Sequence, residues 1–154
     1  MLQLMALFTG IVGGTICTEK VMKKKVDEMR HYADKHLALF LMMNQWVKVK
    51  QEGKNLAQYL DKKGYKKIAI YGMSYAGETL LEELKGTEIQ IAYGIDKNVE
   101  NIYSELDIFS LDDTYANVDA IVVTAITFFD EVQTMLCKKV DCPIISLEEI
   151  LYEV

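Results

Sequence analysis

The segment KIAIYGMSYAGETLLEELK, residues 67–85, changes from a strand pattern to a helix pattern across one short turn. Its first five residues are almost all apolar, which is typical of a strand that is buried on both faces. After the turn, apolar residues recur at helical spacing. A strand joined to a helix by a short turn is the repeating unit of a parallel α/β sheet. The segment therefore predicts an α/β fold.

The remainder of the chain repeats this alternation of strand and helix. Apolar runs predict further strands at 89–95, 106–109, 119–125 and 143–146, and helical spacing predicts helices at 128–139 and from 147 onward. We expect a five-stranded parallel, Rossmann-like sheet of strand order 3-2-1-4-5, with helices on both faces.

Three of the predicted strands end in a hydroxyl followed three residues later by a carboxylate. This spacing is typical of a capping box, in which the two side chains bond reciprocally to the backbone at a helix N-terminus. The three pairs are Ser110/Asp113, Thr127/Asp130 and Ser146/Glu149. Each pair predicts that a helix follows the strand directly.

The turn itself, GMSYAG at 72–77, has the spacing of the dinucleotide fingerprint G-x-G-x-x-G, with Ser74 in place of the middle glycine. In that fingerprint, Gly72 permits the tight turn and Gly77 lets the helix lie close to the first strand. The missing glycine is the one that gives a pyrophosphate close access to the backbone. The Ser74 hydroxyl is able to donate a hydrogen bond to a phosphate instead.

A carboxylate follows the second predicted strand. Asp96 lies 19 residues beyond Gly77, where an acidic residue of a Rossmann domain accepts hydrogen bonds from ribose hydroxyls. Two interpretations remain open. The turn and Asp96 together bind a nucleotide, or the turn only joins a strand to a helix and Asp96 is a local turn residue.

The first 18 residues contain no charged side chain, and a helix of that length spans about 27 Å. Lysines at 20, 23, 24 and 25 follow this run rather than precede it. This arrangement predicts a single-pass membrane anchor at 1–18 with the following domain on the cytoplasmic side of the cell membrane. The alternative is a buried or amphipathic N-terminal helix.

Small residues recur every four positions in the predicted anchor, at Ala6, Gly10, Gly14 and Thr18. Such a stripe lets a second helix approach closely, so it predicts a homo-oligomer formed through the N-terminal helices. The alternative is that small residues are simply common in membrane helices.

The sequence at 19–50 predicts a helical connector between the anchor and a domain at 51–154. Eight positions, seven of them apolar, follow the alternating three- and four-residue steps of a coiled coil: Met22, Val26, Met29, Ala33, His36, Phe40, Met43 and Val47. This seam offers a second surface for self-association. The stretch 37–47 is more apolar than a two-stranded seam needs, so part of it is expected to pack on the domain or on a partner.

Charge is distributed unevenly and excludes one class of partner. Residues 1–67 carry 13 Lys/Arg and 6 Asp/Glu, whereas residues 68–154 carry 4 and 17, a net charge of −13. A domain this acidic repels nucleic acid. The three cysteines lack C-x-x-C spacing, and His31 and His36 do not share a helix face, so no metal site is predicted.

The sequence contains no evident catalytic constellation. One Y-x-x-x-K pair, Tyr59 and Lys63, precedes the first predicted strand, whereas a short-chain dehydrogenase needs that pair after its fourth strand. Histidine is absent after residue 36, and no Ser or Cys has an evident activating base. We therefore do not expect an independent enzyme.

Four stretches of the last 90 or so residues, IAIYGMSYAG, YGIDKN, DAIVVTAIT and CPIISLEEIL, carry a resemblance. This part resembles Rossmann-like nucleotide-binding domains of bacterial surface-polysaccharide enzymes, including the N-terminal domains of sugar acyltransferases and membrane-linked nucleotide-sugar epimerases and dehydratases. The resemblance implies a ligand of the NAD(P) or nucleotide-sugar type.

The resemblance also implies a role for each residue around the turn. Gly72, Ser74 and Gly77 would face the phosphates, and Asp96 the ribose. Thr124, Ala125 and Thr127 would line the far side of the pocket. Met73, Tyr75 and Ala76 complete the turn. Independently of the resemblance, the positive charge of Lys97 beside Asp96 is expected to soften the repulsion between Asp96 and a ribose 2′-phosphate.

Two functions are compatible with these features. The first is a membrane-anchored nucleotide- or nucleotide-sugar-binding protein that serves surface-polysaccharide biosynthesis as a sensor or accessory subunit, with glycan-assembly proteins as partners. The second is a non-catalytic Rossmann scaffold that acts as a protein-interaction module.

Overall fold

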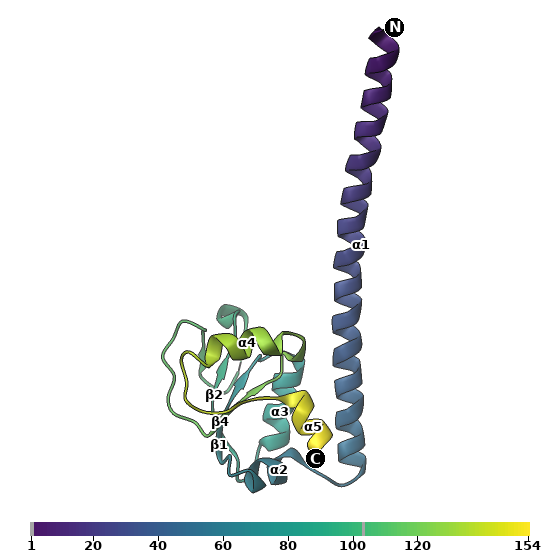
Figure 1. The fold of residues 1–154 in the computed structure, drawn as a ribbon. Coiled ribbons are helices and arrows are strands. Elements are labelled where there is room, and N and C mark those ends of the chain that lie inside the picture. Colours follow the sequence, from purple (N-terminus) through teal and green to yellow (C-terminus); the bar gives the residue numbers. More distant parts are fainter. Residues whose placement is uncertain (1, 103) are drawn as a thin grey trace. The chain divides into compact units, whose positions relative to one another are not determined.

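The computed structural model describes the backbone of residues 2–102 and 104–154 and the side chains of residues 19–100, 102 and 104–154. The chain forms two compact units, residues 1–38 and residues 39–154. The first consists of helix, and the second contains the α/β domain (Figure 1).

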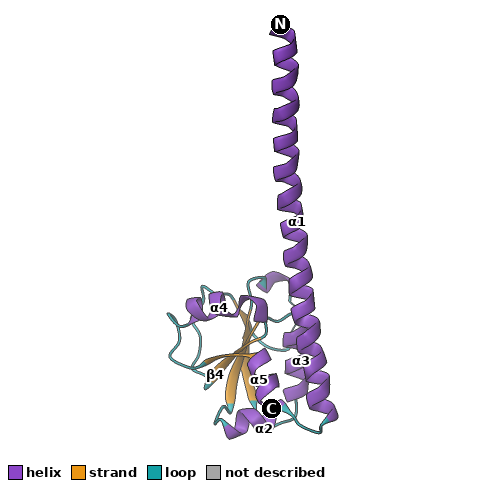
Figure 2. Ribbon diagram, turned by 45° about the vertical axis from the view of Figure 1, so that its right-hand side comes forward, coloured by secondary structure: helices purple, strands orange, loops and turns teal. Residues whose placement is uncertain are grey.

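Five parallel strands form one sheet in the 39–154 unit (Figure 2). They are β1 (Lys67–Tyr71), β2 (Gln90–Ile95), β3 (Ile108–Phe109), β4 (Ala120–Val123) and β5 (Ile144–Ser146). Their order is β3-β2-β1-β4-β5, and every neighbouring pair is parallel. The predicted α/β fold class and strand order are thus confirmed.

Helices cover both faces of the sheet, which is why the central strands are apolar throughout. Ile68 and Ile70 of β1 pack with α2 (Leu56–Lys62), α3 (Tyr75–Leu84) and α5 (Leu147–Glu153). The alternate residues Ala69 and Tyr71 pack on the other face with α4 (Phe129–Leu136). Figure 2 shows α4 on the opposite side of the sheet from α3 and α5. Two short 3₁₀ helices, η1 (Val99–Asn101) and η2 (Ile126–Phe128), come shortly after β2 and β4.

The long helix α1 runs from Leu2 to Gln51, and its last turns belong to the 39–154 unit. Met42, Trp46 and Val49 are buried in the same core as α2, α3 and α5. The expectation that part of the apolar stretch 37–47 packs on the domain is therefore confirmed. Phe40 and Val47, on another side of the helix, stay 67% and 52% exposed.

A buried carboxylate fixes this end of α1 to the domain. Glu83 of α3 accepts hydrogen bonds from Trp46 Nε1 at 2.5 Å and from the Leu56 backbone N–H at 3.2 Å. Its Oε1 also lies 3.1 Å from Lys50 Nζ, and only 7% of the Glu83 side chain is exposed. Three segments thus converge on one side chain.

Within the described residues, no helix has the length and apolarity needed to span a membrane. The anchor predicted at 1–18, together with its stripe of small residues, lies outside the described side chains. The membrane anchor therefore remains a prediction.

The capping boxes were largely a wrong prediction. The Ser110 N–H donates to Asp113 Oδ2 at 2.7 Å, but Ser110 Oγ accepts from the Asp112 N–H at 3.2 Å rather than from Asp113, and these bonds close a turn rather than start a helix. Thr127 lies within η2. Ser146 is the N-cap of α5, without a side-chain hydrogen bond. Short polar side chains bond local amides in turns as readily as at helix ends.

Candidate functional site

The turn after β1 requires both of its glycines. Gly72 has φ +92°, a conformation that side chains disfavour, and a Cβ there would lie 2.7 Å from Thr124 Oγ1. A Cβ on Gly77 would lie 2.2 Å from the Gly72 carbonyl oxygen. Gly72 therefore permits the tight turn and Gly77 the close approach of α3 to it, as the sequence pattern predicts.

Asp96 reaches this turn from the end of β2. Its Oδ2 accepts a hydrogen bond from the Met73 backbone N–H at 2.9 Å, and its Oδ1 accepts one from the Asn98 backbone N–H at 2.9 Å. The structure thus brings together the two features that the sequence places 23 residues apart. A carboxylate has about four acceptor sites, so two remain for other donors.

This contact also uses an amide that the predicted phosphate site would need. The Met73 N–H, directly after Gly72, donates to Asp96 rather than pointing to an open anion site. The Met73 side chain is buried against Gly94: a Cβ added to Gly94 would lie only 2.9 Å from Met73 Cγ. The first half of the turn is therefore held by side chain and backbone of the domain itself.

The second half of the turn is open. Ser74 is the exposed N-cap of α3 and makes no side-chain capping bond, and Tyr75 is 84% exposed. Ala76, on the buried face of α3, belongs to the hydrophobic core. Ser74 and Tyr75 are thus the residues of the turn that face solvent.

The far side of the predicted pocket comes from β4 and η2. The buried Thr124 hydroxyl donates to the Gly72 carbonyl at 2.6 Å and also lies 3.2 Å from that of Tyr71. It therefore ties β4 to β1 beneath the turn. Ala125 lies beside Gly72, because a Cβ added to Gly72 would be 3.5 Å from the Ala125 Cβ. Thr127 is exposed.

Several acidic side chains lie around the turn, at the carboxyl edge of the sheet. Burial, followed by the charges of Asp96 and Glu131, raises the pKa of Tyr71. Lys97 Nζ lies 3.5 Å from Glu131 Oε1, and Glu78 occupies the first turn of α3. These carboxylates oppose the partial positive charge at the N-terminus of α3. The edge therefore suits hydroxyl donors better than multiply charged phosphates.

One hollow of about 280 Å³ reaches the turn through Met73. It lies between α3 and the segment around Ser104, and three of its lining residues are Glu78, Glu82 and Glu105. Lys85 forms ion pairs with the last two, at 3.6 and 3.3 Å. Its acidic lining agrees with the acidic edge of the sheet.

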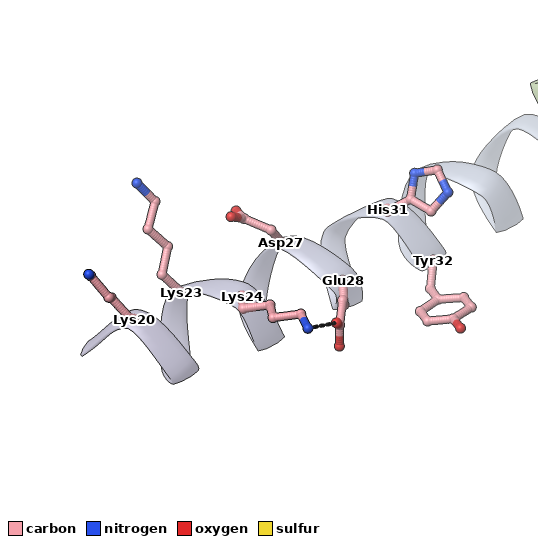
Figure 3. Close-up of a pocket in the computed structure, with 7 residues that line it drawn as sticks. All are labelled: Lys20, Lys23, Lys24, Asp27, Glu28, His31 and Tyr32. Carbon is pink, nitrogen blue, oxygen red and sulfur yellow. Dashed lines mark ion pairs between the residues drawn. The ribbon is translucent and has the colours of Figure 1, made fainter. Parts of the chain in front are cut away.

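Two other hollows carry no comparable chemistry. A hollow of about 670 Å³ on α1 is lined by seven residues of one helix and has no second wall (Figure 3). Another, of about 430 Å³, lies at the amino ends of β4 and β5. There Asp119 accepts from the Lys66 and Lys67 amides, and Lys139 Nζ donates to the Leu111 carbonyl, so their polar groups already serve the fold.

The Y-x-x-x-K pair has a structural role. The Tyr59 hydroxyl donates to Glu153 Oε2 at 2.6 Å, and Lys63 Nζ lies 3.1 Å from the same oxygen. Burial and then the hydrogen bond to Glu153 raise the pKa of Tyr59, which is the opposite of what a catalytic tyrosine base needs. The pair joins α2 to the C-terminal helix.

Within the described part of the chain, no group of three or more His, Cys, Asp or Glu side chains is placed to hold a metal ion. Sequence reasoning missed the Glu83 contacts entirely. The sequence shows only a single tryptophan, Trp46, and a glutamate within a predicted helix, and neither residue type indicates which partner it will bond.

Comparison with known proteins found no match among family models, curated proteins or solved structures. The site is therefore interpreted from its own geometry.

Proposed function

We propose that the 39–154 unit binds a nucleotide at the carboxyl edge of its sheet, with the ribose on Asp96 and the phosphates beside the Gly72–Gly77 turn. The observation that supports this most is the hydrogen bond of 2.9 Å between Asp96 Oδ2 and the Met73 N–H. It joins the end of β2 to the turn after β1 at the edge where parallel α/β sheets bind their ligands.

Each part of the ligand has a group of matching chemistry. Ribose hydroxyls donate to the two acceptor sites left on Asp96, which the Met73 and Asn98 amides hold in place. The exposed Ser74 hydroxyl and the first amides of α3 are donors for a phosphate. The proposed ligand is NAD(P) or a nucleotide sugar.

The acidic side chains at the carboxyl edge make the proposed site selective among nucleotides. Glu78 and Glu131 weaken the attraction of the turn for phosphate, so affinity is modest. A 2′-phosphate would meet the Asp96 carboxylate, and Lys97 is already paired with Glu131. The site therefore favours an unphosphorylated ribose.

The proposal extends to the cellular setting. Residues 1–18 anchor the protein as a single-pass membrane protein, self-associate through their small-residue stripe, and leave the domain on the cytoplasmic side. The support is the uncharged run followed by lysines at 20 and 23–25. By resemblance, the protein serves surface-polysaccharide biosynthesis as an accessory or sensor, together with glycan-assembly proteins.

A second candidate, the non-catalytic scaffold, is favoured by one observation. Both Asp96 oxygens and the Thr124 hydroxyl already have partners within the domain. The turn is thus complete without a ligand, as expected of a strand–helix connection that serves folding alone.

A thermal-shift screen of the full-length chain with NAD, NADP, UDP-sugars and coenzyme A separates the two. Binding raises the free energy of unfolding by about 2.7 kcal/mol when the free ligand is at 100 times its dissociation constant. We expect stabilisation by NAD or a UDP-sugar and less by NADP. If no compound stabilises the chain at millimolar concentration, the scaffold is the better account.

A further inference from the structure

The helical unit, residues 1–38, exposes a row of apolar side chains at coiled-coil spacing. Met22, Val26 and Met29 are 67%, 51% and 64% exposed, and Ala33 and His36 continue the same steps of four and three residues. We call residues 22, 26, 29, 33 and 36 the stalk seam. An average spacing of 3.5 residues keeps such a row against a second helix rather than against a flat surface.

The charges beside the stalk seam have one sign. In a coiled coil, the residues that follow each d position and precede each a position flank the seam and face the partner helix. With Met22 and Met29 at d and Val26 at a, the charged flanking residues are Lys23, Lys25 and Arg30, all exposed. Every charged flank between residues 22 and 36 is basic.

The acidic residues of this segment lie away from the seam. Asp27 and Glu28 occupy outer positions of the heptad, and Glu28 pairs with Lys24, whose Nζ lies 3.9 Å from its Oε1. Figure 3 shows this pair, with Lys20, Lys23 and Asp27 on the other side of the helix. Asp34, the third acidic residue between 22 and 36, also occupies an outer position, so no acidic residue stands at the flanking positions that face a partner helix.

This charge pattern disfavours a second copy as the occupant, contrary to the self-association that the apolar spacing of the seam alone predicts. In a parallel pair, Lys25 of one helix would face Arg30 of the other. In an antiparallel pair, each flanking row would face its own copy, which again brings like charges together. A helix with apolar a and d positions and acidic flanks avoids both conflicts and adds opposite-charge pairs.

We propose that the stalk seam is a docking site for an amphipathic helix of a partner protein whose flanking positions are acidic. The inference does not depend on nucleotide binding by the domain.

The test uses two synthetic probes and the full-length chain. Both peptides have three heptads with Leu at a and d; one has Glu and the other Lys at the flanking positions. Peroxide oxidises exposed methionines, so mass spectrometry of Met22 and Met29 reports whether the seam is covered. We expect the Glu peptide to slow their oxidation and the Lys peptide to leave it unchanged.

Charge reversal provides the specificity control. In Lys25→Glu/Arg30→Glu, the Glu peptide loses two attractive pairs and gains two repulsive ones, so its binding weakens by about tenfold and the Lys peptide binds instead. The matched variant Lys20→Glu/Lys24→Glu changes the same net charge at outer positions and keeps the preference for Glu. A simple loss of fold does not exchange one preference for the other.

Three results overturn the proposal. Equal protection by both peptides means unspecific apolar adhesion. Protection that rises with protein concentration and excludes both peptides makes a second copy the occupant. Protection by phosphatidylglycerol vesicles, with neither peptide binding in detergent, makes the membrane surface the occupant.

Discussion

Replacing Glu83 tests the account of how helix α1 is joined to the domain. In Glu83→Ala, the indole N–H of Trp46, which is 3% exposed, and the backbone N–H of Leu56 both lose their acceptor. A hydrogen bond to a charged group contributes about 1.5–3 kcal/mol. Lys50 is half exposed, so water replaces Glu83 around its ammonium group. The loss of this ion pair therefore adds less than about 1 kcal/mol. We expect a loss of about 3–5 kcal/mol in the free energy of unfolding.

Two further variants make this prediction specific. Glu83→Gln keeps one acceptor oxygen and replaces the other by an NH₂ donor, so either the Trp46 or the Leu56 N–H loses its acceptor, and it is expected to cost about 1.5–3 kcal/mol. Glu82→Ala removes the neighbouring carboxylate, which is 70% exposed and pairs with Lys85, and is expected to cost less than about 1 kcal/mol.

Urea unfolding followed by circular dichroism and by tryptophan fluorescence measures all three. Trp46 is the single tryptophan of the chain, so its emission reports this junction directly. The reasoning is refuted if Glu83→Ala is as stable as Glu82→Ala, or if Trp46 emission is unchanged in the folded Glu83→Ala protein.

Three other predictions concern the turn and the sheet. Gly77→Ala should destabilise the domain by about 1–3 kcal/mol, since its Cβ meets a backbone oxygen, whereas Glu78→Ala should stay within about 0.5 kcal/mol in urea unfolding. Thr124→Val should cost about 1–2 kcal/mol because the carbonyl of Gly72 loses its donor; an unchanged urea midpoint would contradict the bond. Burial raises the pKa of Tyr93 to about 12, which favours the neutral hydroxyl in the folded state. The contribution of Tyr93 to the free energy of unfolding should therefore be constant below about pH 10 and be lost as the pH rises from there through about 12; tyrosinate absorbance of the folded protein that titrates entirely near pH 10 would contradict this.

Periodicity was sufficient to predict the sheet because each strand is covered on both faces. The run at 67–71 is apolar almost throughout, and the structure places β1 at Lys67–Tyr71. The ends of elements were less predictable. The strand expected at 106–109 contains only Ile108 and Phe109. Asp107 precedes it and accepts a backbone hydrogen bond from the Gly94 N–H, outside the two residue pairs of the regular ladder.

The site was predictable where backbone geometry demands one residue type. Gly72 and Gly77 are such positions, since a side chain at either would collide with a named atom. The bond from Met73 to Asp96 was not predictable, because a sequence pattern gives the location of a carboxylate and not the donors it accepts from. The same limit hid Glu83, whose partners come from separate segments.

Calorimetric titration of matched variants tests nucleotide binding most directly. Asp96 and Asp119 each accept two backbone N–H groups, Asp96 at the carboxyl edge of the sheet and Asp119 at the amino edge. Asp119 accepts both N–H groups on Oδ2, so Asp119→Asn keeps an oxygen for them, whereas Asp96 accepts one on each oxygen and Asp96→Asn replaces one acceptor by an NH₂ donor. Urea unfolding of both variants therefore accompanies the titration, to show that each is folded, and only Asp96→Asn changes the proposed ribose contact. We predict that NAD or a UDP-sugar binds the wild type and Asp119→Asn equally, and binds Asp96→Asn at least about tenfold more weakly. Equal heats from all three proteins, or no heat from the wild type at millimolar ligand, would contradict the proposal.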